Sequence, residues 1–260
     1  MTTIFSAISD DFLADLTAIT ELISAAQAPG NSARSRIASV NSSTLLLAAI
    51  FEEFVRELGR QYARETVSRC VDSSQIPRKL TATAWKRTLE GLARAKIDTG
   101  GTPEPMELIS RKARSSFEAV CSFLEGDRTQ DIYESLIHNE NNMRPDQLNA
   151  VFSICDLKDV CSKTSMRSDL SRYFDEEDSG KVHGMLLTRL NDFMEKRNYI
   201  AHSLNAGSSS VPDNLLDDIS FFKALALSLA ETLPEHLPKS LAETLPEHLP
   251  NTSRTSPTDY

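Results

Sequence analysis

Three side chains in the last third of the chain have the types and the spacing to cleave a phosphodiester bond. They are Arg197, Asn198 and His202, in the segment Arg-Asn-Tyr-Ile-Ala-His. Histidine accepts or donates a proton near neutral pH, and arginine offers a fixed fork of donors to phosphate oxygens. Asparagine can orient the imidazole or hold a phosphate oxygen. Because RNA carries its own nucleophile, the 2′-hydroxyl, these residues predict metal-free RNA cleavage to 2′,3′-cyclic phosphate and 5′-hydroxyl ends.

The spacing places only part of this trio on one helical face. Asn198 and His202 are four residues apart and are expected to lie on nearly the same face of a helix. Arg197 and His202 are separated by about 140° around a helix axis. Three solutions remain open: the long Arg side chain swings round, the helix end unwinds, or copies from a second subunit complete the site.

Helical periodicity begins with the first residues of the chain. The repeat of three and four between apolar residues predicts an N-terminal amphipathic helix within residues 1–30, ended by Pro29 and Gly30. The apolar stripe of this helix consists of Phe5, Ile8, Phe12, Leu16, Ile19 and Ile23.

Residues 31–233 are predicted to form one all-α domain, a helical bundle with extra short helices and no strand. Its first long helix is expected to begin near Ser42, Ser43 and Thr44, whose hydroxyls can cap free backbone amides, and to run towards Val67. We expect a shorter helix around Trp85, another from Met106 to Leu124, two or three short helices within 126–165, an acidic loop at 173–181, and closing helices at about 182–203 and 212–232.

The C-terminal end carries one clear repeat. Residues 228–239 recur as residues 240–251 with a single difference, at the last position. Two copies do not make a solenoid, and the repeated prolines forbid a continuous helix. The sequence therefore predicts a duplicated, Pro-rich and disordered tail over residues 234–260.

The charge balance permits an RNA partner without requiring one. The net charge is −9, but residues 34–114 hold 15 Lys or Arg and 9 Asp or Glu, and the rest holds 13 and 28. A moderately basic half could follow a phosphate backbone, although a solvated helical face of mixed charge has the same composition.

The composition points to a cytoplasmic protein. The longest apolar stretch, Leu45 to Phe51, is too short to span a membrane, and the N-terminus shows no secretory signal, so we expect no membrane partner. Four scattered cysteines are expected to be reduced and buried. No group of residues has metal-ligand spacing, and the prediction is no metal and no cofactor.

The sequence resembles the HEPN superfamily, and within it the RiboL-PSP-type HEPN nucleases of bacterial defence and toxin–antitoxin systems. The segment 197–202 matches the family motif of Arg, a polar residue, three further residues and His. Residues 47–55 are similar to a long family helix, and residues 140–143 with 148–152 resemble a connecting region. Ser203 stands where many relatives have Gly, and the tail is much longer.

This resemblance implies a homodimer whose active site is formed by both copies of the motif. By position it makes Arg197, Asn198 and His202 catalytic, and Glu52 a weaker candidate as a polar partner in the cleft. It also implies RNA as the substrate and an antitoxin or sensor protein as a possible partner.

The main alternative is a non-catalytic helical adaptor that dimerises and binds a protein or a nucleotide. Arg197 would then make a surface ion pair with a nearby acid such as Asp192 or Glu195, and His202 would interact with free carbonyls at a helix end. The intact trio argues against this alternative, because a scaffold has no chemical need for it. A DNA-binding regulator is less well supported, since no helix-turn-helix pattern stands out.

Overall fold

The chain is all-helical, as the sequence analysis predicted. The computed structural model describes residues 3–94, 106–137, 142–202 and 212–239. Within these residues it contains a short 3-10 helix, Ser73–Gln75, and no strand. The α-helices are α1 Ile4–Ala26, α2 Ala33–Arg69, α3 Arg78–Arg94, α4 Met106–Leu124, α5 Tyr133–Leu136, α6 Pro145–Ser153, α7 Val160–Thr164, α8 Ser168–Phe174, α9 Ser179–His202 and α10 Pro212–Glu235.

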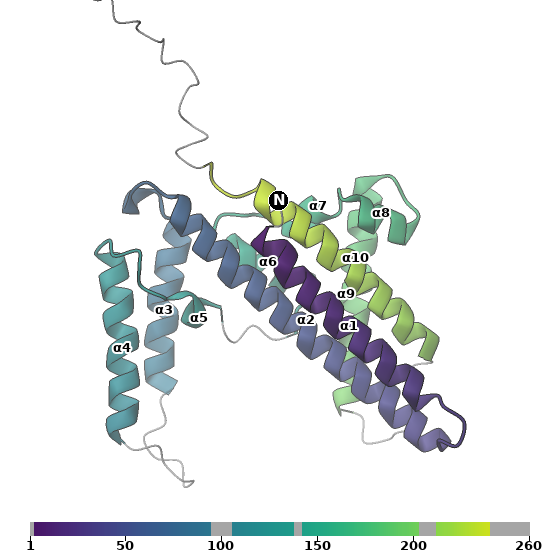
Figure 1. The fold of residues 1–260 in the computed structure, drawn as a ribbon. Coiled ribbons are helices and arrows are strands. Elements are labelled where there is room, and N and C mark those ends of the chain that lie inside the picture. The colour runs from purple at the N-terminus through teal and green to yellow at the C-terminus, as the bar shows by residue number, and fades with distance from the viewer. Residues whose placement is uncertain (1–2, 95–105, 138–141, 203–211, 240–260) are drawn as a thin grey trace, which may run out of the picture.

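The long helix α2 is the axis of the fold. At 37 residues it extends over about 55 Å. The helix α1 packs along α2 on one side and along α10 on the other, while α9 crosses behind them (Figure 1). At the other end of the molecule α3 and α4 stand side by side, and α3 packs on the short helix α5. Residues from both ends of the chain therefore share one core.

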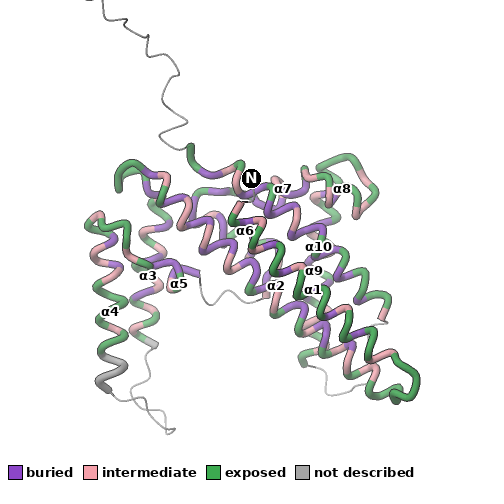
Figure 2. The backbone as a smooth tube through the Cα atoms, viewed as in Figure 1, coloured by how far each residue is buried: buried purple, intermediate pink, exposed green. Residues whose placement is uncertain are grey.

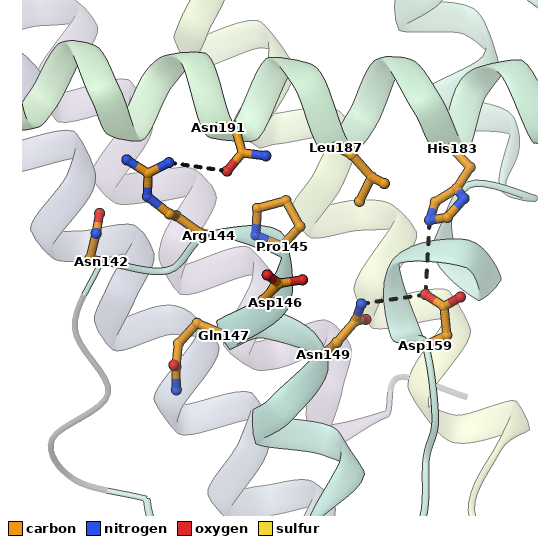
Figure 3. Close-up of a pocket in the computed structure, with 10 residues that line it drawn as sticks. All are labelled: Asn142, Arg144, Pro145, Asp146, Gln147, Asn149, Asp159, His183, Leu187 and Asn191. Carbon is orange, nitrogen blue, oxygen red and sulfur yellow. Dashed lines mark hydrogen bonds and ion pairs between the residues drawn. The ribbon is translucent and has the colours of Figure 1, made fainter.

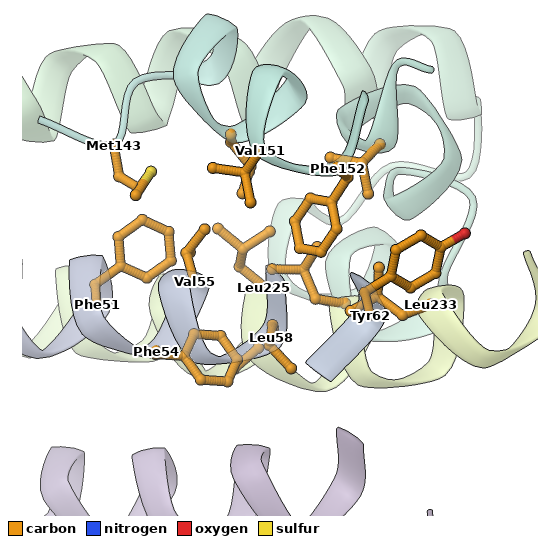
Figure 4. Packing of buried hydrophobic residues seen from close by; sticks show 14 of the residues in the cluster. Phe51, Phe54, Val55, Leu58, Tyr62, Met143, Val151, Phe152, Leu225 and Leu233 are labelled. Carbon is orange, nitrogen blue, oxygen red and sulfur yellow. The ribbon is translucent and has the colours of Figure 1, made fainter. Parts of the chain in front are cut away.

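An aromatic cluster joins α1, α2, α9 and α10. The Phe12 ring stacks on Phe54 with centroids 4.4 Å apart, and Phe222 lies 4.5 Å from Phe51 and 4.6 Å from Phe193. Figure 4 shows how Phe51, Val55 and Tyr62 of α2 meet residues of α6 and α10. Burial of one such side chain contributes roughly 1.5–3 kcal/mol. This cluster fixes the position of α9 relative to α2, which the candidate site requires.

Helix α2 also has the length and hydropathy of a membrane-spanning segment. The mean hydropathy of its best 18-residue window is 1.2, and 44% of that window is buried inside the protein. The helices α1, α5, α6, α9 and α10 pack against it. These contacts are those of a core helix in a helical bundle.

The predicted start of α2 was wrong. The helix begins at Ala33, and the Ser32 hydroxyl accepts the backbone N–H of Ser35 as its cap. Ser43 and Thr44, predicted as the cap, are buried inside the helix, where the Thr44 hydroxyl donates to the Val40 carbonyl. A hydroxyl inside a helix can bond to the carbonyl four residues earlier, so Ser and Thr alone do not mark a helix start.

Two further regions differ from the sequence analysis. Helix α8 was not foreseen, and it covers the first part of the predicted acidic loop, so that only residues 175–178 separate α8 from α9. Residues 234–239, assigned to the tail, belong to the fold: the Tyr62 hydroxyl donates to the His236 carbonyl at 2.7 Å, and Leu237 is buried. The second copy of the repeat, 240–251, lies outside the described residues.

Gly59 of α2 lies where neighbouring segments approach this helix closely. A Cβ atom there would meet Val151 Cγ1 at 2.5 Å and Ile137 Cδ1 at 2.9 Å, both on buried side chains. We expect Gly59→Ala to lower the free energy of unfolding by about 1–3 kcal/mol, because overpacking outweighs the better helix propensity of Ala. Urea unfolding measures this change.

Gly184 of α9 is the matched control for that experiment. A Cβ atom at Gly184 meets nothing within 4 Å, so Gly184→Ala should leave stability unchanged or raise it by up to about 1 kcal/mol. Equal behaviour of the two variants would contradict the tight contact at Gly59.

Candidate active site

The Arg-Asn-x-x-x-His segment forms the last turns of α9. The apolar face of this helix is buried and holds it against the core through Val182, Leu186, Leu190, Phe193 and Met194. Lys196 Nζ donates to the buried Asp218 of α10 at 2.6 Å, and Arg189 Nη1 pairs with the same carboxylate at 2.9 Å. These contacts position the motif turn, and the helix stays continuous through His202 rather than unwinding.

Arg197 and Asn198 lie beside Glu52, although 145 residues separate Glu52 from Arg197 in the chain. Arg197 Nη2 is 3.8 Å from Glu52 Oε1, and Arg197 Nη1 donates to Asn198 Oδ1 at 3.0 Å. The first distance indicates a charge–charge contact, because it is longer than a hydrogen bond. The structure thus brings together three of the four residues singled out from the sequence.

Glu52 lies on the buried side of this cluster. Its side chain is only 7% exposed, and that of Arg197 is 29% exposed. Glu52 Oε1 also accepts the backbone N–H of Asn142 at 2.7 Å, and Asn142 itself has a positive φ of 57°. A buried carboxylate is costly unless it is paired and hydrogen-bonded, and here both conditions are met. Glu52 therefore supplies a buried negative charge beside the guanidinium of the partly exposed Arg197.

His202 is exposed at the end of α9 and does not join the cluster within one chain. Among the described residues, no hydrogen bond or ion pair holds its ring, and it lies on the Asn198 face as the spacing predicts. With respect to the described residues, its imidazole is exposed to a ligand or a second protein surface. Among the described residues, the structure shows neither an unwound helix end nor a contact of Arg197 with His202, and completion of the site by a second subunit stays a prediction.

A polar cavity of about 640 Å³ continues along the same face of α9 (Figure 3). His183, Leu187 and Asn191 line it from α9, at spacings of four residues that lead on towards Asn198 and His202. The remaining lining residues come from the segment before α6, from α6 and from the cap of α7: Asn142, Arg144, Pro145, Asp146, Gln147, Asn149 and Asp159.

Arg144 brings a second guanidinium to this face. Its Nη1 atom is 3.4 Å from Asn191 Oδ1 and 3.5 Å from Glu195 Oε1. The sequence analysis singled out neither Arg144 nor His183, and both line this cavity. Two signals could have found this face: the four-residue spacing along α9, and the resemblance of residues 140–143 to a family connecting region.

The described residues give less support to a metal site or to a cysteine nucleophile. They contain no group of three or more His, Cys, Asp or Glu that could hold a metal ion. All four cysteines are free thiols, and Cys70, Cys155 and Cys161 are buried. Burial raises the pKa of Cys155 and of Cys161 to about 12, so neither is a thiolate nucleophile at neutral pH.

Comparison with known proteins identifies a family. The model of the RiboL-PSP-HEPN family matches residues 10–235, a span that includes Glu52, Arg197, Asn198 and His202. Searches of curated proteins and of solved structures gave no match.

Proposed function

Because the chain belongs to the RiboL-PSP-HEPN family, we propose that it is a metal-independent endoribonuclease with Arg197, Asn198 and His202 as its catalytic residues. The observation that carries this proposal is the arrangement at the end of α9. A guanidinium paired with a buried carboxylate lies on the same helix end as an exposed imidazole, five residues further on, that has no competing partner among the described residues. These are the groups that cleavage of RNA needs.

The reaction would proceed by attack of the 2′-hydroxyl on the adjacent phosphorus. A new O2′–P bond forms, the P–O5′ bond breaks, and the products are a 2′,3′-cyclic phosphate and a 5′-hydroxyl. One imidazole accepts the 2′ proton, and an acid returns a proton to the 5′ oxygen. The Arg197 fork stabilises the extra charge on the phosphorane oxygens, and Asn198 holds a phosphate oxygen or orients the ring.

A homodimer would supply the groups that a single chain lacks. The reaction needs both a base and an acid, and one chain contributes one His202. A two-fold axis near the end of α9 would bring two His202 and two Arg197 residues to one substrate. The exposure of His202, without a partner from its own described chain, is consistent with such a composite site.

The biological setting is a further part of the proposal. Members of this family resemble nucleases of bacterial defence and toxin–antitoxin systems, so we expect a cytoplasmic protein whose activity an antitoxin or a sensor restrains. The substrate would be cellular or phage RNA.

A purified protein and a mixed RNA pool in EDTA test the nuclease directly. Wild-type protein should produce 2′,3′-cyclic phosphate and 5′-hydroxyl ends, and sedimentation should show a dimer under the same conditions. A folded dimer that leaves RNA intact would favour the adaptor alternative. Products with 3′-hydroxyl ends would refute 2′-hydroxyl attack.

Glu52 is proposed as a positioning residue that acts through Arg197. We expect Glu52→Gln to lower kcat by roughly 10-fold with little change in KM, because the neutral amide keeps its size but no longer holds the guanidinium in place. Steady-state kinetics on a labelled oligoribonucleotide measure both constants.

Glu53 provides the matched control for Glu52. It is exposed and pairs with Arg56 and Arg60 of its own helix rather than with Arg197, so Glu53→Gln should leave both constants within two-fold of wild type. If Glu52→Gln raised KM and left kcat unchanged, or if the two variants behaved alike, the positioning role would be refuted.

A further inference from the structure

The helices α3 and α4 form a basic hairpin in an acidic protein. We use the name basic hairpin for Arg78–Arg94 together with Met106–Leu124. These two helices contain eight Lys or Arg and three Glu, a net charge of +5, while the rest of the chain contains 20 basic and 34 acidic residues, a net charge of −14. Part of the excess of Lys and Arg in residues 34–114 therefore lies on the basic hairpin.

Most of the cationic side chains on the basic hairpin face solvent. Helix α4 packs on α3, and α3 packs on α5, which leaves the outer surfaces of both helices uncovered (Figure 1). The tube in Figure 2 is correspondingly exposed or intermediate over nearly all of the described length of α4. The exposed basic residues are Arg78, Lys79, Lys86, Arg111, Lys112 and Arg114.

Two partly exposed aromatic rings lie among these charges. Trp85 of α3 is 36% exposed, Phe117 of α4 is 40% exposed, and their ring centroids are 5.8 Å apart. Trp85 therefore packs against Phe117 at the surface of the hairpin rather than in the core. Exposed aromatic rings of this size remain available for a flat ligand.

Each ring shares a helix face with a cation. Arg78 is seven residues before Trp85, about two turns away on the same face of α3. Arg114 is three residues before Phe117 and is its neighbour on α4. A groove or ridge of positive charge with interleaved aromatic residues is the arrangement by which proteins bind single-stranded nucleic acid: cations follow the phosphates and bases stack on the rings.

We propose that the basic hairpin is the surface that captures single-stranded RNA, with phosphates on its cations and an unpaired base stacked on Trp85. This inference rests on the proposed function, and it assigns binding to α3 and α4 while cleavage takes place at the end of α9. It explains how a chain of net charge −9 holds a polyanion. Self-association through this surface is disfavoured, because a two-fold interface would oppose two surfaces of the same charge.

Binding to an uncleaved substrate tests the proposal. Full-length His202→Ala, which is expected not to cut, is titrated against a fluorescent 20-nucleotide RNA at several salt concentrations. The change Arg78→Glu with Arg114→Glu, made in that background, should weaken binding at least 10-fold and flatten the salt dependence, because at least two phosphate contacts are lost.

The control variant carries the same change in net charge at two positions outside the basic hairpin. Arg172 and Lys181 are exposed and lie outside the basic hairpin, and Arg172→Glu with Lys181→Glu should keep binding within two-fold. Equal weakening by both pairs would mean that only net charge matters, and an unchanged affinity of the hairpin variant would place RNA elsewhere. Either result overturns the proposal.

Trp85 gives a second readout that needs no substitution in the hairpin. It is the only Trp in the chain, so intrinsic Trp fluorescence reports from this site alone. RNA should quench it in parallel with binding, and polyglutamate should not. RNA that binds without quenching would refute the stacking contact, and quenching by polyglutamate with comparable affinity would identify an acidic protein as the better partner.

These experiments can refute the RNA-binding proposal and the nuclease proposal separately. If the wild-type protein leaves RNA intact while the hairpin variant loses binding, the nuclease proposal is refuted and the capture surface stands. If the wild type cuts RNA but reversal of the hairpin charges does not weaken binding, the nuclease stands and the capture surface is refuted.

Discussion

The variant His202→Ala is expected to lose RNA cleavage by a factor of about 10²–10⁴, the contribution that a positioned acid or base makes. Stability should change little, because His202 is exposed and makes no hydrogen bond or ion pair among the described residues. The measurement is the single-turnover rate on a labelled oligoribonucleotide, with thermal unfolding of the same preparations.

The control for His202→Ala lies on the same helix. Met185 is an exposed residue of α9 outside the cavity and the motif, and Met185→Ala should cleave at the wild-type rate. A wild-type rate for His202→Ala would show that the imidazole takes no part in proton transfer and that the site assignment is mistaken.

Arg197→Ala should reduce the cleavage rate by about 10²–10³, the loss observed when a donor to a developing oxyanion is removed. Arg197→Lys should retain part of the rate, because it keeps the charge without the planar fork. The exposed Arg172 is the matched control, and Arg172→Ala should leave the rate unchanged. The same single-turnover assay measures all three variants.

Arg197→Ala also removes the cation that faces the buried Glu52, so it should destabilise the fold as well. The double variant with Glu52→Gln separates the two effects. It removes the unpaired charge and should recover stability while cleavage stays low. Recovery of cleavage together with stability would mean that Arg197 serves the fold and not the reaction.

The helical architecture could be predicted to a large extent, because the spacing of apolar residues that indicates a helix lies within one short segment of the chain. The stripe from Phe5 to Ile23 in α1 is buried as expected, and Pro212 begins α10. Helix ends were predicted less well. The start of α2 was placed about ten residues late because Ser43 and Thr44 have the same residue types as a cap, and their burial depends on contacts that the sequence does not show.

The candidate site could be predicted only in part. The proposed catalytic motif could be recognised because Arg197, Asn198 and His202 lie close together in the sequence. Glu52 came from the resemblance alone, and its contact with Arg197 joins α2 to α9 across the fold. Arg144 was missed because its place beside Asn191 depends on how the segment before α6 packs, and no local pattern marks it.

The packing of α10 along α1 has a consequence for the order of folding. The two helices lie at opposite ends of the chain, so their shared core cannot close until α10 has been synthesised. At about 5–20 residues per second, α1 waits on the order of 10 seconds or longer for its partner. A nascent chain therefore carries the motif of α9 before the core that positions it is complete. The proposed site would therefore form only after α10 has packed against α1.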